Sequence, residues 1–252
     1  MELIQITEEN LEREHICCAI SNNKDCQVKS KKAWLAERLA EGLVFLKGNV
    51  RGKCFIEYIP AEYAWAPVTA AGYMYINCFW VSGQLKGQGN SNLLLDSCIR
   101  DSREKGKLGL AVLSSPKKMP FLSDPGYLKH RGFRVADTAE PYFELLYLPF
   151  VEDAPAPLFR EQARRPQTQG CGFELYYTCQ CPFTAKYVPL VQEAAHDMGI
   201  PFRSILLDRC EAAQNAPCAA TSYSMFYDGK FITNEILSVK KFLALAEKLA
   251  GG

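Results

Sequence analysis

A short turn rich in glycine carries the clearest chemical signal in the sequence. Residues 80–96 read WVSGQLKGQGNSNLLLD, in which Gly83, Gly87 and Gly89 follow an apolar run and precede an amphipathic segment. Glycine lets backbone amides approach a ligand without a Cβ in the way, and the first turn of a helix offers unpaired N–H donors and partial positive charge. The turn is therefore a candidate site for a phosphate or pyrophosphate, with Lys86 as a further cation. Tight packing without a ligand is the alternative, and the spacing fits neither a Walker A loop nor a dinucleotide fingerprint.

Two cysteines form a second candidate site. Cys179 and Cys181 lie in the segment CQCPFT, between a strand pattern and a helical pattern. A thiol at the start of a helix is expected to have a lowered pKa and to be reactive. A thiol cluster also suits a soft metal such as zinc, but the C-x-C spacing fits no standard zinc ribbon, and no metal site is predicted. The remaining interpretation is that the cysteines serve as small, buried apolar side chains.

Two carboxylates are the candidate general bases. Glu57 and Glu62 lie in KCFIEYIPAEYAWAPV, just before the apolar run at 73–81. Tyr63 and Trp65 interleave with them, and a wall of aromatic rings and carboxylates would suit a cationic amine. Charges on an edge strand beside an ordinary core would give the same pattern.

The elements that must position these residues alternate in type, which predicts an α/β fold. In the first 150 residues, strand patterns cover 43–46, 53–59, 73–81, 108–113 and 142–148, and helical patterns cover 31–42 and 91–105. After a stretch rich in proline and glycine, strand patterns cover 173–178, 202–208, 222–227 and 230–233, and helical patterns cover 185–198 and 238–249. Asp228-Gly229 predicts a hairpin between the last two strands. We therefore predict one domain over 1–150, a linker over 151–169 and a smaller α/β domain over 170–252.

Composition narrows the classes of partner. The chain has 252 residues, 29 Lys and Arg against 28 Asp and Glu, and a net charge of +1. This balance argues against a broad surface for nucleic acid or anionic membrane. The 11 cysteines, together with the acidic start MELIQITEEN, indicate reduced thiols in the cytoplasm. The uncharged stretch 63–85 is interrupted by Pro67 and Gly72 and predicts buried strands, not a membrane span.

The glycine turn resembles the acetyl-CoA motif of the GNAT superfamily of N-acetyltransferases, written Q/R-x-x-G-x-G/A. Two registers fit, one starting at Gln84 and the other at Lys86. The second keeps the usual distance from the preceding valine, with Lys86 and Ser91 in place of the usual residues. The resemblance implies that acetyl-CoA is the co-substrate. The implied contacts are Trp80, Val81, Lys86, Gly87, Gln88, Gly89, Asn90 and Ser91.

The GNAT resemblance extends over about 70–150, and more loosely over 1–70. It implies a mixed sheet in which two parallel strands separate to admit the pantetheine arm, and a segment ending in Gly132-Phe133. Members often use a tyrosine four residues before that glycine as the acid that protonates the leaving thiolate. Leu128 occupies this position, and Tyr127 lies one residue earlier. Tyr127 is therefore the candidate acid, or alternatively an aromatic side chain in the packing of a short helix.

The C-terminal part resembles a thioredoxin-like fold, and Cys181-Pro182-Phe183-Thr184 resembles a monothiol active site. Two features depart from that family: Cys179 and Cys181 do not make a C-x-x-C, and Ala220-Thr221 stands where a Thr-Pro pair is usual. The whole arrangement resembles bacterial acetyltransferases with a YoaP-like C-terminal domain.

The sequence thus predicts an N-acetyltransferase that acts on a small-molecule or peptide amine. Two alternatives stay open. One is a thiol-redox or metal-sensing protein in which the C-terminal cysteines do the chemistry, and the other is a CoA-binding module without catalytic activity.

Overall fold

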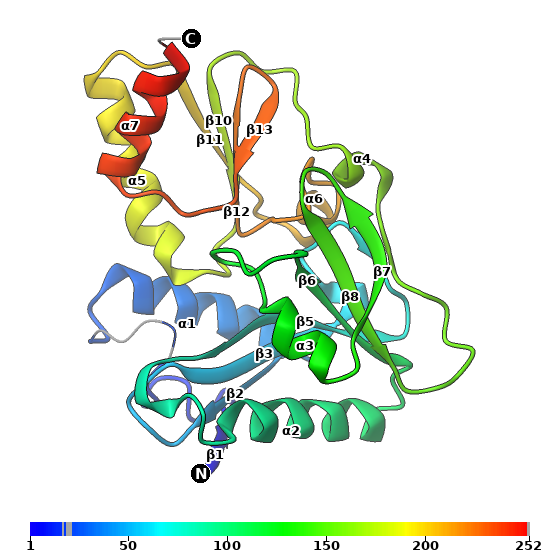
Figure 1. Ribbon diagram of the computed structural model, residues 1–252. Coiled ribbons are helices and arrows are strands. Elements are labelled where there is room, and N and C mark those ends of the chain that lie inside the picture. Colours follow the sequence, from blue (N-terminus) through cyan, green and yellow to red (C-terminus); the bar gives the residue numbers. More distant parts are fainter. Residues whose placement is uncertain (17, 19–21, 251–252) are drawn as a thin grey trace.

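A seven-stranded mixed sheet forms the larger part of the molecule (Figure 1). The computed structural model describes residues 1–16, 18 and 22–250. The strands lie in the order β1-β2-β3-β5-β6-β8-β7, with β5 and β6 parallel and the other neighbours antiparallel. Their bounds are β1 (Leu3–Gln5), β2 (Val44–Gly48), β3 (Cys54–Pro60), β5 (Tyr73–Val81), β6 (Gly109–Ser114), β7 (Arg134–Ala139) and β8 (Phe143–Pro149). The predicted mixed α/β architecture is confirmed.

Helices cover both faces of this sheet, which we call the α1 face and the α2 face (Figure 1). On the first lies α1 (Cys26–Leu39), and on the second lie α2 (Asn90–Glu104) and the short α3 (Pro125–His130). The sequence placed α2 to within one residue, but α1 begins five residues earlier than predicted. Asp25 explains the difference, because its carboxylate accepts a hydrogen bond from the N–H of Gln27 (2.8 Å) and caps the helix. None of the described helices has the length and apolar character needed to cross a membrane.

Strand β5 separates from β6 after half its length. The parallel pairing joins Tyr73–Ile76 to Gly109–Val112, and β5 then continues to Val81. At this point the register against β3 shifts, because Glu57 faces Cys78 while the next residue of β3 faces Ile76. Asn77 is thus the extra residue of a β-bulge, which bends its strand and interrupts regular pairing. Residues 73–76 are buried, whereas 77–80 are partly exposed.

A second sheet forms the C-terminal part, with strand order β11-β10-β12-β13. β10 and β11 are parallel, whereas β12 is antiparallel to β10 and β13 to β12. The elements are β10 (Phe173–Tyr177), α5 (Pro182–Asp197), β11 (Phe202–Leu206), α6 (Cys210–Gln214), β12 (Tyr223–Tyr227), β13 (Lys230–Thr233) and α7 (Val239–Ala250). Asp228 and Gly229 both have positive φ angles, 46° and 76°, and form the predicted hairpin turn.

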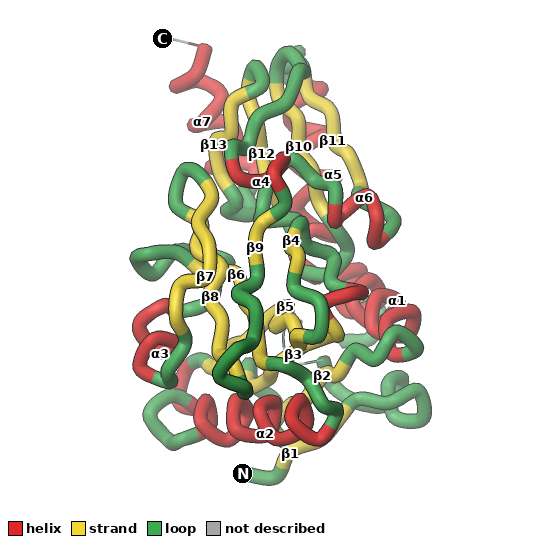
Figure 2. Tube along the Cα trace, turned by 90° about the vertical axis from the view of Figure 1, so that its right-hand side faces the viewer, coloured by secondary structure: helices red, strands yellow, loops and turns green. Residues whose placement is uncertain are grey.

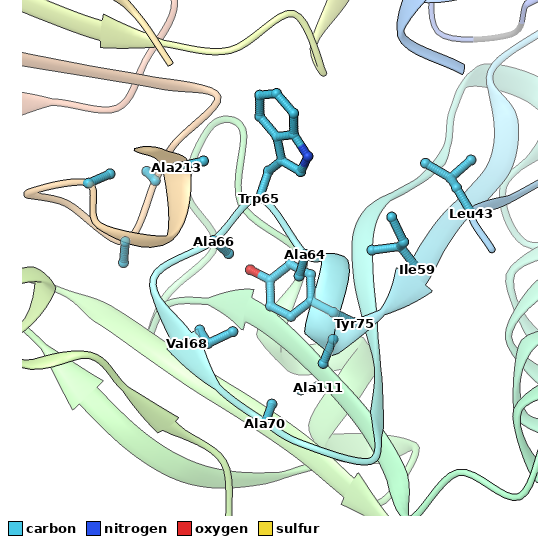
Figure 3. Close-up of a cluster of buried hydrophobic side chains, with 14 of the residues drawn as sticks. Leu43, Ile59, Ala64, Trp65, Ala66, Val68, Ala70, Tyr75, Ala111 and Ala213 are labelled. Atoms are coloured by element: carbon cyan, nitrogen blue, oxygen red, sulfur yellow. The ribbon is translucent and has the colours of Figure 1, made fainter. Parts of the chain in front are cut away.

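The segment that joins the two sheets is itself structured. β9 (Leu158–Phe159) pairs with β4 (Val68–Thr69), and the one-turn α4 (Glu161–Arg164) follows (Figure 2). Two-residue strands are too short to produce a periodic pattern, so the sequence did not predict them. One hydrophobic cluster continues through this joint, from Trp65 and Ala66 to Ala213 of α6 (Figure 3). The two sheets are therefore packed on a common core.

Candidate functional site

The glycine turn is open to solvent. After the short 3₁₀ helix η2 (Gly83–Leu85), residues 86–89 are exposed. Gly83, Gly87 and Gly89 have φ angles of +60°, +75° and +76°, and a Cβ on any of them would meet nothing within 4 Å. The glycines are thus required by the backbone conformation and not by close packing, which argues against the packing interpretation.

The turn presents backbone donors at the start of α2. Gly89 is the N-cap residue, so the N–H groups that follow it have no acceptor within the helix. Two side-chain bonds hold the loop in shape: Asn90 Nδ2 donates to the carbonyl oxygen of Leu85 (2.9 Å), and Gln88 Nε2 to that of Gln84 (2.6 Å). With the exposed Lys86 beside them, these donors form a cradle for an anion.

Tyr127 lies on the α2 face, close to the start of α2. Its hydroxyl donates to Oδ1 of Asn92 (3.0 Å) and accepts from the guanidinium of Arg131 (3.2 Å). Its ring meets that of Phe79 in β5, with centroids 5.7 Å apart. Burial raises the pKa of Tyr127, against the opposing effect of the Arg131 charge, so the phenol keeps its proton at neutral pH. The structure thus brings Tyr127 to the part of β5 that has left β6.

Glu57 lies on the α1 face in a buried ion pair. Its Oε2 is 2.5 Å from Nζ of Lys31, and its Oε1 accepts from Nδ2 of Asn77 (3.1 Å). Burial would lower the pKa of Lys31, but the charge and hydrogen bond of Glu57, together with the nearby thiols of Cys18 and Cys78, outweigh burial and raise the pKa, so Lys31 is cationic. Both oxygens of Glu57 are thus engaged in hydrogen bonds within the protein, which argues against the predicted role of general base.

Glu62, the other predicted base, lies apart from these residues. Its carboxylate accepts from the N–H of Gly72 (2.7 Å), just before the start of β5, and pairs with Lys107 at 3.5 Å. Asn77 and the glycine turn lie toward the other end of that strand. The structure therefore does not bring Glu62 together with Glu57, Tyr127 or the turn.

The C-terminal cysteines reach the α1 face of β5 through the residue between them. Nζ of Lys31 donates to the carbonyl oxygen of Gln180 (2.7 Å), and Nε2 of Gln180 donates to that of Asn77 (3.2 Å). Sequence reasoning missed Lys31, Asn77 and Gln180. No local signal marks them, because Gln180 is 149 residues from Lys31 and 103 residues from Asn77 along the chain.

The expected lowering of the thiol pKa is wrong for Cys181. Although Cys181 is the N-cap residue of α5, burial raises its pKa to about 11 and outweighs the cationic neighbours Lys31 and Lys53. Burial also raises the pKa of Cys78 in β5, aided by the negative charge of Glu57. Low dielectric around a sulfur disfavours the thiolate, and here it dominates over the helix dipole.

We expect Cys181 to alkylate slowly at neutral pH. With a pKa of about 11, its thiolate fraction should rise roughly tenfold for each pH unit up to that value. Iodoacetamide labelling of the native protein from pH 7 to 10, read by peptide mass spectrometry, tests this. The exposed Cys26 and Cys171 serve as internal controls and should react first. Rapid labelling of Cys181 at pH 7 would contradict the burial argument.

A metal site requires several ligating side chains close together. In the residues that the structure describes, no three His, Cys, Asp or Glu side chains are grouped so that they hold a metal ion.

Comparisons with known proteins give one relative over nearly the whole chain. This relative, described as an uncharacterized N-acetyltransferase YoaP of Bacillus subtilis strain 168, is 43% identical over 248 residues, which cover 98% of the chain and 99% of the relative. The family model called YoaP-like matches residues 201–243.

Solved structures match more distantly. A GNAT-family acetyltransferase from Staphylococcus aureus Mu50 is 14% identical with a TM-score of 0.42, covering 60% of the chain and 99% of that protein. YhbS from Escherichia coli, a GNAT-family N-acetyltransferase in complex with CoA, is 12% identical with a TM-score of 0.42, covering 64% and 89%.

Proposed function

Because the chain belongs to the family of the YoaP N-acetyltransferase, we propose that it transfers the acetyl group of acetyl-CoA to an amine. The observation that carries the proposal is the open glycine turn at the start of α2, beside the point where β5 leaves β6. We take the large sheet to be a GNAT-type acyltransferase domain over 1–150. A parallel pair at its centre and a bulge at Asn77 support this assignment.

In this proposal acetyl-CoA lies along the second half of β5. Its pyrophosphate binds the backbone N–H groups of residues 86–91, with Lys86 as counter-charge, and its pantetheine arm passes along Trp80 and Val81. Main-chain donors and a helix N-terminus favour a doubly charged group over a neutral one. The thioester is thereby held near Asn77, where the strand bends.

The reaction then needs two proton movements. The neutral amine attacks the thioester carbonyl, the C–N bond forms, and the C–S bond breaks to release CoA thiolate. The amine nitrogen loses one proton to solvent or a base, and the thiolate gains one. Tyr127 is the proposed source of that second proton, because its phenol is protonated and lies against Phe79 of β5.

Replacing Tyr127 by Phe should lower kcat about tenfold while KM for acetyl-CoA changes less than twofold. The effect is smaller than the hundredfold or more typical of a general acid, because a thiolate is a good leaving group. Steady-state rates of CoA release, measured with a thiol reagent, test this. Tyr63→Phe, at an exposed position, is the matched control. An unchanged kcat in Tyr127→Phe would remove the acid role.

The C-terminal part, over 170–252 after a linker at 151–169, is proposed to be a thioredoxin-like, YoaP-like domain that serves as a wall of the acceptor side. Its βαβ unit followed by an antiparallel hairpin and a helix supports the fold. The raised pKa of Cys181 and the absence of C-x-x-C from the sequence argue against a role as disulfide reductase. The exposed Cys26 and Cys171 carry free thiols, which suits the reducing cytoplasm.

Isothermal titration with acetyl-CoA tests the proposed function. We expect binding in the micromolar range, weakened by pyrophosphate as a competitor, and transfer of acetyl to amines detected by mass spectrometry. Failure to bind acetyl-CoA at high micromolar concentration would contradict the proposal. Binding without transfer to any amine would instead favour the CoA-binding module.

A further inference from the structure

The bulge in β5 directs two consecutive side chains to the α1 face. Cys78 packs with the hydrophobic residues of that face, and the amide of Asn77 reaches Glu57, which lies there with Lys31. Phe79 packs instead with the residues of the α2 face, as Tyr127 does. The Asn77 amide therefore lies on the α1 face, and α2 lies on the opposite face of the sheet.

The Asn77 amide is fixed in one orientation. A carboxylate only accepts hydrogen bonds, so the bond to Glu57 must come from the amide nitrogen. The side chain of Gln180 also holds Asn77, because its Nε2 donates to the backbone carbonyl oxygen of Asn77. The side-chain oxygen Oδ1 is then directed elsewhere. It is buried, and no group in the described part of the chain donates a hydrogen bond to it. Buried polar atoms of native proteins are usually paired, so this oxygen lacks a partner that a ligand N–H would supply.

Lys53 adds a positive charge to the same neighbourhood. Its Nζ lies 3.9 Å from the ring centroid of Trp80 and 5.6 Å from that of Phe183 in α5. Lys31, Glu57 and Lys53 all act electrostatically on the thiol of Cys181, so all three lie in the neighbourhood of that residue. Glu57 neutralises Lys31, whereas no carboxylate of the described residues forms an ion pair with Lys53.

We propose that this face binds the acceptor, and that the acceptor is an amine that also carries an anionic group. The amine donates an N–H to Oδ1 of Asn77, and the anion pairs with Lys53. The inference rests on the proposed acetyl transfer and names the class of its second substrate. The aromatic and carboxylate wall expected to attract a cation is not assembled here, because Glu57 is neutralised and Glu62 lies elsewhere.

A panel of matched amines tests the class. Each anionic amine is paired with a neutral one: amino acids with their amides, and phosphoethanolamine with ethanolamine. We expect kcat/KM to be about tenfold higher or more for the anionic member, as one charge-assisted contact would give. The two sets of pairs separate a carboxylate from a phosphate. An amino acid amide has the less basic amine and loses its proton more readily, so the comparison is biased against the expected result.

Variants at two positions locate the contacts. Lys53→Gln should abolish the preference for the anionic member, and Lys53→Arg should keep it. Asn77→Ala should lower kcat/KM for all amines about tenfold with an unchanged acetyl-CoA affinity. Lys248→Gln, which removes one positive charge from the exposed side of α7, is the charge-matched control and should behave as the natural protein.

The outcomes separate this inference from its premise. A neutral member as good as the anionic one, an undiminished preference in Lys53→Gln, or acetyl-CoA binding without acetylation of any anionic amine would each overturn the inference. Failure to bind acetyl-CoA would overturn the proposed function itself.

Discussion

Replacing Gly87 by Val should weaken acetyl-CoA binding about a hundredfold or more. Gly87 lies in the left-handed region at φ +75°, with open space where a Cβ would be added. A branched side chain would project into the place proposed for the pyrophosphate and would disturb two or more hydrogen bonds to a charged group. Each such bond contributes about 1.5–3 kcal/mol, and 1.4 kcal/mol is a factor of ten in Kd. Titration calorimetry measures the change.

Gly106→Val is the matched control for backbone strain. Gly106 is exposed just beyond the other end of α2, has φ +68°, and also has open space around it. Both variants should lose about 1–2 kcal/mol of unfolding free energy from the left-handed conformation, but only Gly87→Val should lose acetyl-CoA affinity. Equal affinities in the two variants would place the cofactor elsewhere.

Replacing Lys31 by Met should lower the free energy of unfolding by about 3–5 kcal/mol, because it leaves the Glu57 carboxylate buried without a counter-charge. The substitution also removes the donor to Gln180. The pKa of Lys31 is raised above its ordinary value of 10.5, so the pair's contribution is complete below that pH and is lost as pH rises through the folded-state pKa. Urea unfolding should therefore give the same difference at pH 7 and pH 9.

Two further variants separate the ion pair from other effects of the substitution. Lys29→Met, on the exposed side of the same helix, should change the unfolding free energy by less than about 0.5 kcal/mol. Adding Glu57→Gln to Lys31→Met should recover most of the lost unfolding free energy, because the double variant has no unpaired buried charge. The side-chain oxygen of the new glutamine would still accept the hydrogen bond from Asn77. A double variant as unstable as the single one would show that packing, not charge, is responsible.

The elements of the fold were largely predictable because their signals are local. The run YMYINCFWV gave β5, and the amphipathic spacing after Gly89 gave α2. The bulge at Asn77 was not predictable, since it depends on how two strands align and not on the residue type. The linker strand β9 was not predicted, because two residues are too few to show the alternation of apolar and polar side chains typical of a strand.

The candidate site divides in the same way. The glycine turn is contiguous in sequence, and its place between a strand and the start of a helix was predicted correctly. The group around Glu57 is assembled from segments that are far apart along the chain, so no local pattern indicates that Lys31 neutralises the carboxylate. The reactivity expected of Cys181 was wrong because helix-start position is visible in a sequence, whereas burial by another part of the chain is not.

The seam between the two sheets contains many alanines, among them Ala64, Ala66 and Ala213 (Figure 3), and the same cluster includes Ala216 and Ala220. Such short side chains let two backbones approach closely and leave little free volume for sliding or hinge motion. The molecule should therefore work as one rigid body. Its substrates should therefore reach β5 without the two parts moving apart, because widening the gap between them would break this contact.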